Sequence, residues 1–167
     1  MNDNIEQKSQ LPQDQQKTHA RLRIEQAIWQ KSDSYFESLF DEKAENSPAK
    51  KLRAAFSDTE KGTTQVRNLE NIAYTTGKLS DIYDFLKRQM GRPGKLGEQW
   101  RNDNVGQDLL TELSGLQKDA QEIKDEVKKK FPLGVGDDTA RQIHLRLCQE
   151  YIKHVAAHFQ YAAKVNL

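Results

Sequence analysis

Two histidines four residues apart, His154 and His158, have the spacing that comes nearest to a metal site in this sequence. Residues four apart lie on one face of a helix, and Glu150, one turn earlier, would add a carboxylate oxygen. The His-Glu-x-x-His order of zinc proteases is absent, however, and no further ligand is indicated. We therefore interpret both histidines as surface or interface residues, and we expect no metal and no other cofactor.

The other residues with catalytic potential have no suitable neighbours in the sequence. Asp137 and Asp138 are better explained as the cap of a following helix than as an acid/base pair. No serine lies in a Gly-x-Ser-x-Gly elbow, and His19 stands alone. An active site brings together several ionisable groups with complementary roles. Because no such set is indicated, we expect a binding or scaffolding protein without catalytic residues.

A glycine-rich segment, residues 91–97 (GRPGKLG), carries the strongest loop signal of the chain. The Walker pattern and the Gly-x-Gly-x-x-Gly pattern are both absent and no strand precedes the segment, so nucleotide hydrolysis is not expected. The segment is basic all the same, and Trp100 follows it closely. The cations in and beside it are Arg88, Arg92, Lys95 and Arg101.

The charge balance limits how this chain can bind nucleic acid. Its 167 residues include 26 Lys and Arg against 25 Asp and Glu, which gives a formal net charge of +1. A nearly neutral protein contacts RNA or DNA through local patches rather than through its overall charge. The single cysteine, Cys148, excludes an internal disulfide, and its place beside an apolar stripe predicts a buried thiol rather than a reactive one. With no signal-peptide pattern and no membrane-spanning run, we expect a cytoplasmic protein that does not bind membranes.

One long helix is predicted over residues 138–165, where Asp138 or Thr139 can cap the first turn and neither Gly nor Pro interrupts. Its apolar residues recur at steps of four or three, so they form a wide stripe suited to the middle of a helical bundle. The opposite face carries cations that either stay in water or meet an anionic partner. The stripe consists of Ile143, Leu147, Tyr151, Val155, Phe159 and Ala162, widened by Ile152, Ala156 and Ala163.

Helical periodicity extends over most of the remaining chain. An even seam in the segment before the last helix fits bundle packing. The first helix carries a set of aromatic residues, including Trp29, Phe36 and Phe40, that is more typical of a core or a partner interface than of a base-stacking platform. The seam is Leu109, Leu113, Leu116, Ala120, Ile123 and Val127, and the first helix adds Ile24, Ala27, Ile28, Tyr35 and Leu39.

These patterns predict an all-α fold, a single compact bundle of about five or six helices formed by residues 18–167. Residues 1–17 have almost nothing to bury and are predicted to be a disordered tail. Gly77 divides the third segment, which is then either two helices or one kinked helix. The segments before the last helix are residues 18–45, 48–56, 63–90 and 107–130.

Three short stretches of the sequence carry recognisable local patterns. Residues 147–161 (LCQEYIKHVAAHFQY) contain an aromatic residue, a Val-Ala pair and a closing Tyr within the last predicted helix. Residues 62–69 (GTTQVRNL) fit a Thr-Thr-x-(Ile/Val)-Arg helix start, and residues 74–78 (YTTGK), followed by residues 84–87 (DFLK), fit a Tyr-x-x-Gly-basic step. In these three patterns the chain resembles the small subunit of type III-A CRISPR effector complexes, the Csm small-subunit family. The second and third stretches lie closer together here than in the family pattern.

The resemblance implies a non-catalytic role in antiviral defence. In that family several small subunits stack head to tail beside the backbone subunits that hold the guide RNA, together with a large signature subunit, and they line the groove where target RNA pairs with the guide. Expected partners are therefore guide RNA, target RNA, those subunits and other copies of this chain. The cations expected to contact RNA phosphates are Arg67, Arg88, Arg92, Lys95, Arg101, Arg141 and Arg146, with Lys50, Lys51 and Arg53 as a second patch.

Three other functions are compatible with the residues. A protein–protein adaptor without RNA binding would use the apolar stripes of the first and last helices to dock partner helices. An unrecognised all-α enzyme would have His144, His154 and His158 as its candidate groups. A helix-turn-helix DNA-binding protein is disfavoured because the connector from Phe56 to Thr63 is longer than the tight turn of that motif.

Overall fold

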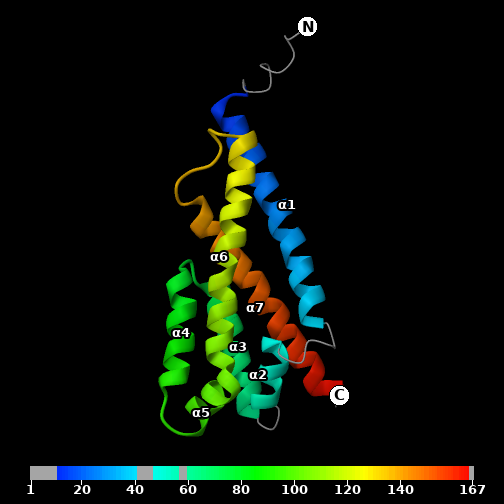
Figure 1. The fold of residues 1–167 in the computed structure, drawn as a ribbon, viewed down its shortest axis with the longest axis vertical. Coiled ribbons are helices and arrows are strands. Elements are labelled where there is room, and N and C mark those ends of the chain that lie inside the picture. Colours follow the sequence, from blue (N-terminus) through cyan, green and yellow to red (C-terminus); the bar gives the residue numbers. More distant parts are fainter. Residues whose placement is uncertain (1–10, 41–46, 57–59, 166–167) are drawn as a thin grey trace.

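The computed structural model describes residues 11–40, 47–56 and 60–165. Within these ranges the chain forms helices and no strand, which confirms the predicted all-α bundle (Figure 1). The described ranges contain seven α-helices, one of which, α5, begins within the segment where the sequence predicted a loop. The helices are α1 (Gln13–Phe40), α2 (Pro48–Phe56), α3 (Glu60–Thr75), α4 (Leu79–Gly91), α5 (Lys95–Arg101), α6 (Val105–Lys130) and α7 (Thr139–Val165), with a 3-10 turn, η2 (Asn102–Asn104), before α6.

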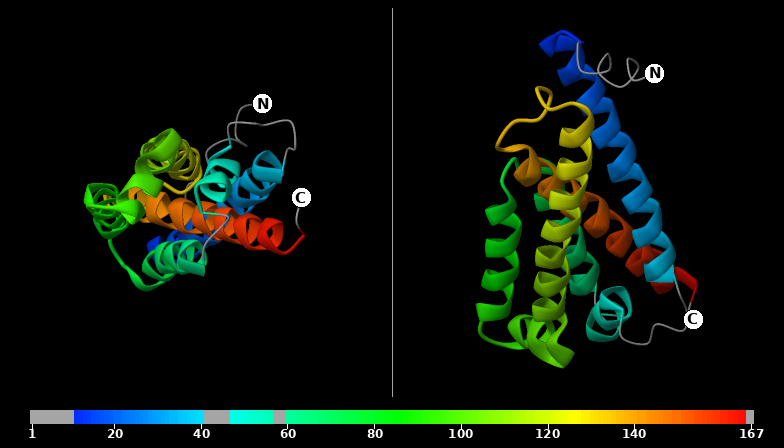
Figure 2. Two further views of the ribbon diagram at one scale, coloured as in Figure 1. Left: turned by 90° about the horizontal axis from the view of Figure 1, so that it is seen from below. Right: turned by 45° about the horizontal axis from the view of Figure 1, so that its top comes forward.

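The last helix, α7, lies in the middle of the bundle. It contacts α1, α2, α3, α4 and α6, and Figure 2 shows these helices arranged around it. The predicted stripe faces inward, since Ile143, Leu147, Tyr151, Val155 and Phe159 are buried together with Ile152 and Ala156. The side chains of Ala162 and Ala163 lie outside the described part. The seam of α6 is likewise buried along its whole length, from Leu109 to Val127, and packs against α7.

The first helix begins earlier than predicted. Residues 13–17, assigned to a disordered tail, form the first turn of α1, while residues 1–10 lie outside the described part. The reason is Gln16, a buried polar side chain that donates to the Leu11 carbonyl (3.0 Å) and accepts from the Leu133 N–H (3.1 Å). The amide thereby ties the start of α1 to the connector after α6, so its burial leaves no polar group unsatisfied.

The aromatic residues of α1 do not all belong to the core. Ile28, Tyr35 and Leu39 are buried, but Trp29 is 61% exposed and Phe36 45% exposed. Of the two interpretations of this aromatic set, core or partner interface, the core is excluded for Trp29, because it lies on the outer side of the helix. The predicted end of this helix, residues 41–45, falls outside the described part.

Between α3 and α4 the chain turns at Gly77, so this segment is two helices rather than one kinked helix. Thr76 organises the turn, because its hydroxyl oxygen accepts from the Lys78 N–H (3.0 Å) and lies 2.5 Å from a carboxylate oxygen of Asp81. The turn from α4 to α5 is equally well defined. Gly94 adopts a φ of +76°, which favours glycine, and a Cβ on Gly97 would lie 1.8 Å from the Arg92 carbonyl oxygen.

Candidate nucleic-acid interface

Four predicted RNA contacts lie together where α4 turns into α5, a region we call the α4–α5 corner and define by Arg88, Arg92, Lys95 and Arg101. All four are exposed, and the corner occupies the end of the bundle opposite the connector between α6 and α7 (Figure 1). Three of them, Arg88, Arg92 and Lys95, form no ion pair with a carboxylate in the part of the chain that the structure describes. No carboxylate of the described residues therefore neutralises their charges.

Arg101 has a different role in the corner. Its guanidinium donates to the Met90 carbonyl, at the C-terminal end of α4, and to the Arg92 carbonyl (3.1 Å). Those carbonyls are acceptors that a helix end leaves without intrahelical partners, and a cation there also interacts favourably with the helix dipole. Arg101 therefore stabilises the turn that displays the other three cations.

Trp100 does not offer a surface for base stacking. Its side chain has 0% exposure, and its ring packs edge-to-face against Phe56 (centroids 5.1 Å apart) and Phe85 (6.5 Å). The aromatic residue that the sequence places beside the basic loop is thus part of the core. Binding at the corner would rest on phosphate contacts alone, which position RNA without reading its sequence.

The second predicted patch, on α2, is only partly available. The Lys51 ammonium lies 2.5 Å from a carboxylate oxygen of Asp108 on α6, and its side chain is 15% exposed. The hydrogen bond to Asp108 raises the pKa of Lys51, so this charge is neutralised within the fold. Lys50 and Arg53 are half-buried and lie near His158, whose pKa is lowered by burial and then by these two cations.

Arg146 belongs to a cationic cavity that the sequence did not reveal. The cavity, about 320 Å³ between α1 and α7, brings Lys17 and Arg21 to Arg146, which also pairs with Glu25 (3.3 Å). Thr139 places the positive end of the α7 dipole at its edge. Lys17 was assigned to the disordered tail, and no motif relates α1 to α7, so only the packing of the two helices shows this cluster.

The remaining predicted cations lie apart from these groups. Arg141, in the first turn of α7, lines a cavity of about 470 Å³ with Lys78 at the start of α4. Since α4 has 13 residues, the start of α4 lies about 20 Å from the corner at 1.5 Å per residue. Arg67 is exposed on α3. The predicted contacts therefore form several separate groups rather than one continuous surface.

A serine, a histidine and a glutamate do meet in this fold, but not as a catalytic triad. Ser32 Oγ of α1 donates to a Glu150 carboxylate oxygen (2.9 Å) and lies 2.8 Å from His154 Nε2. In a hydrolase triad the carboxylate binds the histidine, which accepts the serine proton. Here the serine proton goes to Glu150, so the Nε2–H of His154 is the donor. Ser32 is also only 6% exposed. The three residues cross-link α1 and α7.

The other candidate enzyme groups also have structural contacts. His144 is buried and its Nε2 lies 2.8 Å from the Leu113 carbonyl, which joins α7 to α6. Cys148 is buried beside the same carbonyl, and burial raises the pKa of its thiol to about 12. Among the described residues no three His, Cys, Asp or Glu side chains gather where a metal could be held. No described helix has the length and apolar character needed to span a membrane.

Comparison of the chain with protein-family models, with curated proteins and with solved structures finds no match.

Proposed function

We propose that this chain is a non-catalytic, RNA-contacting small subunit of a type III CRISPR ribonucleoprotein effector. The observation that carries the proposal is the α4–α5 corner, where Arg88, Arg92 and Lys95 are exposed and make no ion pair with a described carboxylate. In this role several copies stack along the guide RNA beside the backbone and large signature subunits, and the corner contacts guide or target RNA phosphates in antiviral defence.

The chemistry of the corner fits phosphate binding. The planar guanidinium groups of Arg88 and Arg92 can each hold a phosphate through two donors, whereas Lys95 offers a point charge. The groups of the protein that would otherwise suggest catalysis, His144 and His154, are engaged in bonds between helices. A subunit that positions RNA and leaves cleavage to others agrees with both features.

The proposal is tested by co-expression with type III effector subunits and a guide RNA, followed by purification through a tag on a partner subunit. The expected result is that this chain co-purifies in more than one copy. Target-RNA affinity is then measured against salt for a corner variant, Arg88→Gln/Arg92→Gln/Lys95→Gln. At about 0.7 per neutralised phosphate, the slope of log affinity against log salt should become shallower by about 2 for each copy of the variant chain in the complex.

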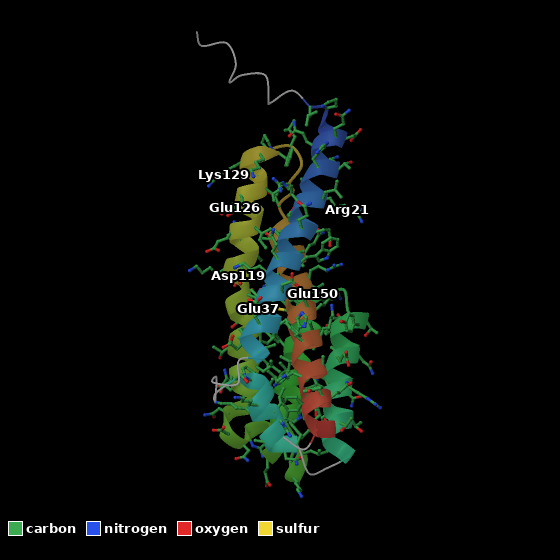
Figure 3. The ribbon with its side chains drawn as sticks, turned by 90° about the vertical axis from the view of Figure 1, so that its right-hand side faces the viewer. Arg21, Glu37, Asp119, Glu126, Lys129 and Glu150 are labelled. Atoms are coloured by element: carbon green, nitrogen blue, oxygen red, sulfur yellow. The ribbon has the colours of Figure 1, made fainter. Side chains whose placement is uncertain are left out.

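A matched control removes the same charge at the other end of the bundle. Lys128, Lys129 and Lys130 are exposed at the C-terminal end of α6, where Figure 3 labels Lys129. Replacing these three by Gln should leave the salt slope unchanged. An equal loss in both variants would show that binding is non-specific, and recovery of the chain without partners or RNA affinity would overturn the proposal.

A protein–protein adaptor without RNA binding is the second candidate, favoured by the exposed Trp29 and Phe36 on α1. Partner binding that persists after nuclease treatment and in the corner variant would support it.

A further inference from the structure

The cavity of about 320 Å³ between α1 and α7 gathers positive charge at the end of the bundle opposite the α4–α5 corner. Lys17, Arg21 and Glu25 follow one another by four residues, so they lie along one face of α1, on which Figure 3 labels Arg21. Arg146 reaches the same cavity from α7 and pairs with Glu25 (3.3 Å), the only carboxylate among the described residues that line it. Three cations and one carboxylate give the cavity a net charge of +2.

Four side chains of this cavity have donors that the described fold does not use. Lys17 and Arg21 form no ion pair and no side-chain hydrogen bond with a described residue, and neither do the side chains of Thr139 and Gln142, at the start of α7. Water can satisfy each donor singly. The feature that points to a ligand is that all four, from two helices, line one cavity, where a single anion can accept from several of them at once.

The cavity also has an apolar floor and a fixed wall. Ile28 and Ile143 are buried and Ile24 is half-buried, and the three line the cavity beneath the charges. The wall includes Gly134 of the connector between α6 and α7, which lies so close to α1 that a Cβ on it would be 2.5 Å from the Gln16 carbonyl oxygen. An apolar lining with a few convergent polar groups is typical of small-molecule sites, whose volumes begin at about 300 Å³.

We propose that this cavity binds a phosphomonoester with an apolar organic part. The phosphate lies between Lys17, Arg21 and Arg146, and the organic part lies on the isoleucine floor. A phosphomonoester carries about 1.5 to 2 negative charges near neutral pH and three strong acceptor oxygens, so it matches both the charge of the cavity and the number of its cations. The two guanidinium groups can each hold the phosphate through two donors.

Other anions match the cavity less well. A carboxylate has a single negative charge and only two oxygens. A phosphodiester also has a single charge, and its chain continues on both sides of the phosphate, whereas the connector at Gly134 forms a wall on one side. The phosphomonoester has two possible sources, a free phosphorylated small molecule or the terminal phosphate of an RNA strand.

This site goes beyond the proposed function and does not depend on it. It uses none of the residues of the α4–α5 corner. The corner variant Arg88→Gln/Arg92→Gln/Lys95→Gln should therefore bind a small phosphomonoester as wild type does, and either proposal can fail without the other.

The test is an amide NMR titration of the purified full chain with phenyl phosphate. Wild type should show saturable binding, with the largest shifts at the N–H groups of Gly134, Thr139 and Gln142. Methyl phenyl phosphate has one charge fewer, and inorganic phosphate lacks the apolar part, so each should bind at least about tenfold more weakly. Equal affinity for the three compounds would show adventitious anion binding only and would overturn the proposal.

Two substitutions on α1 should change the affinity in opposite directions. Arg21→Gln should weaken phenyl phosphate binding by about tenfold, because it removes a charge-assisted contact. Glu25→Gln should tighten binding by about two- to fivefold, because it releases Arg146 from its ion pair and removes the competing carboxylate.

The matched control is Arg23→Gln, which removes the same charge from an exposed residue of α1 that lines a different groove, against α6. It should leave the affinity unchanged, and circular dichroism checks that every variant is folded. The proposal is overturned by a wild-type chain that does not bind phenyl phosphate saturably, or by equal losses in Arg21→Gln and Arg23→Gln.

A second titration identifies the source of the phosphate. The probes are adenosine 5′-monophosphate and a short RNA with a 5′-phosphate, compared with the same RNA ending in a 5′-hydroxyl. Tighter binding of the phosphorylated strand than of the other two probes would identify an RNA end as the ligand. Tightest binding of the mononucleotide would identify a free phosphorylated molecule, and tightest binding of the hydroxyl strand would contradict a phosphomonoester site.

Discussion

The ammonium group of Lys51 lies 2.5 Å from a carboxylate oxygen of Asp108, and this ion pair joins α2 to α6. By sequence, Lys51 belongs with Lys50 and Arg53 in a basic patch. In the fold its side chain is 15% exposed, between two helices that the bundle packs together. Lys51 is thus held in an ion pair between two helices, whereas Lys95 is exposed and has no ion pair with a described carboxylate, and only packing distinguishes the two lysines.

We predict that Lys51→Ala lowers thermal stability and leaves RNA affinity unchanged, because it leaves the carboxylate of Asp108 without its partner. Lys95→Ala should do the reverse, weakening RNA binding with no change in melting temperature. Differential scanning fluorimetry and a filter-binding titration on both variants check the pair. Loss of RNA affinity in a stable Lys51→Ala protein would contradict this assignment.

Glycine substitutions in two helices should have opposite effects on stability. A Cβ on Gly97 would lie 1.8 Å from the Arg92 carbonyl oxygen, so Gly97→Ala forces the α4–α5 corner apart and should cost more than about 2 kcal/mol. Gly115 lies within α6 and a Cβ there meets nothing within 4 Å, so Gly115→Ala should stabilise by about 0.5–1 kcal/mol. Urea denaturation measures both, and similar effects at the two sites would contradict the packing described.

How much of this could be predicted from the sequence depends on how local the signal is. The seam from Leu109 to Val127 and the stripe on α7 are periodic in one helix, and both were identified correctly. Gln16 shows the limit, since its burial depends on the Leu133 N–H, which is 117 residues away in the chain. Hydropathy assigns such a residue to the surface, so the start of α1 was missed.

The candidate site was harder to predict because charge clusters are properties of packing. Arg88, Arg92 and Lys95 are close in sequence beside the predicted loop, and the structure places them together at the α4–α5 corner. Arg146 lies near Lys17 and Arg21 only because α1 packs against α7, and no sequence motif predicts that packing. Periodicity alone also did not place Trp29, since an apolar residue at helical spacing fits either side of a broad stripe.

Cys148 should be unreactive in the folded protein. Its thiol is buried and its pKa is raised by burial to about 12, so almost no thiolate forms near neutral pH. A thiol reagent such as 5,5′-dithiobis(2-nitrobenzoic acid) should react slowly in buffer and rapidly in denaturant. Rapid reaction of the folded chain would show that the core opens around α7.

Acid should destabilise the fold first through His154 and His158. Burial lowers the pKa of both, with Lys153 adding to the effect at His154 and Arg53 and Lys50 at His158. In the unfolded chain each histidine titrates near its ordinary pKa of about 6.5, so below that pH the unfolded chain binds more protons than the folded one. The stability these groups provide is complete above about pH 6.5 and is lost as pH falls through their lower folded-state pKa values.

Glu150 should cause a second loss of folding stability, at a lower pH than the loss caused by the two histidines. Burial raises its pKa, but hydrogen bonds from Lys153 and Ser32 outweigh burial and leave the pKa below 4.5, so its contribution disappears only in stronger acid. We predict that His154→Gln/His158→Gln flattens the free energy of unfolding between about pH 7 and pH 5.5. The double histidine variant should still lose free energy of unfolding below about pH 4.5. Glu150→Gln should instead keep the loss between about pH 7 and pH 5.5 and show a smaller one below about pH 4.5. Urea unfolding across this pH range checks both, and an unchanged slope above pH 5.5 in the histidine variant would refute the assignment.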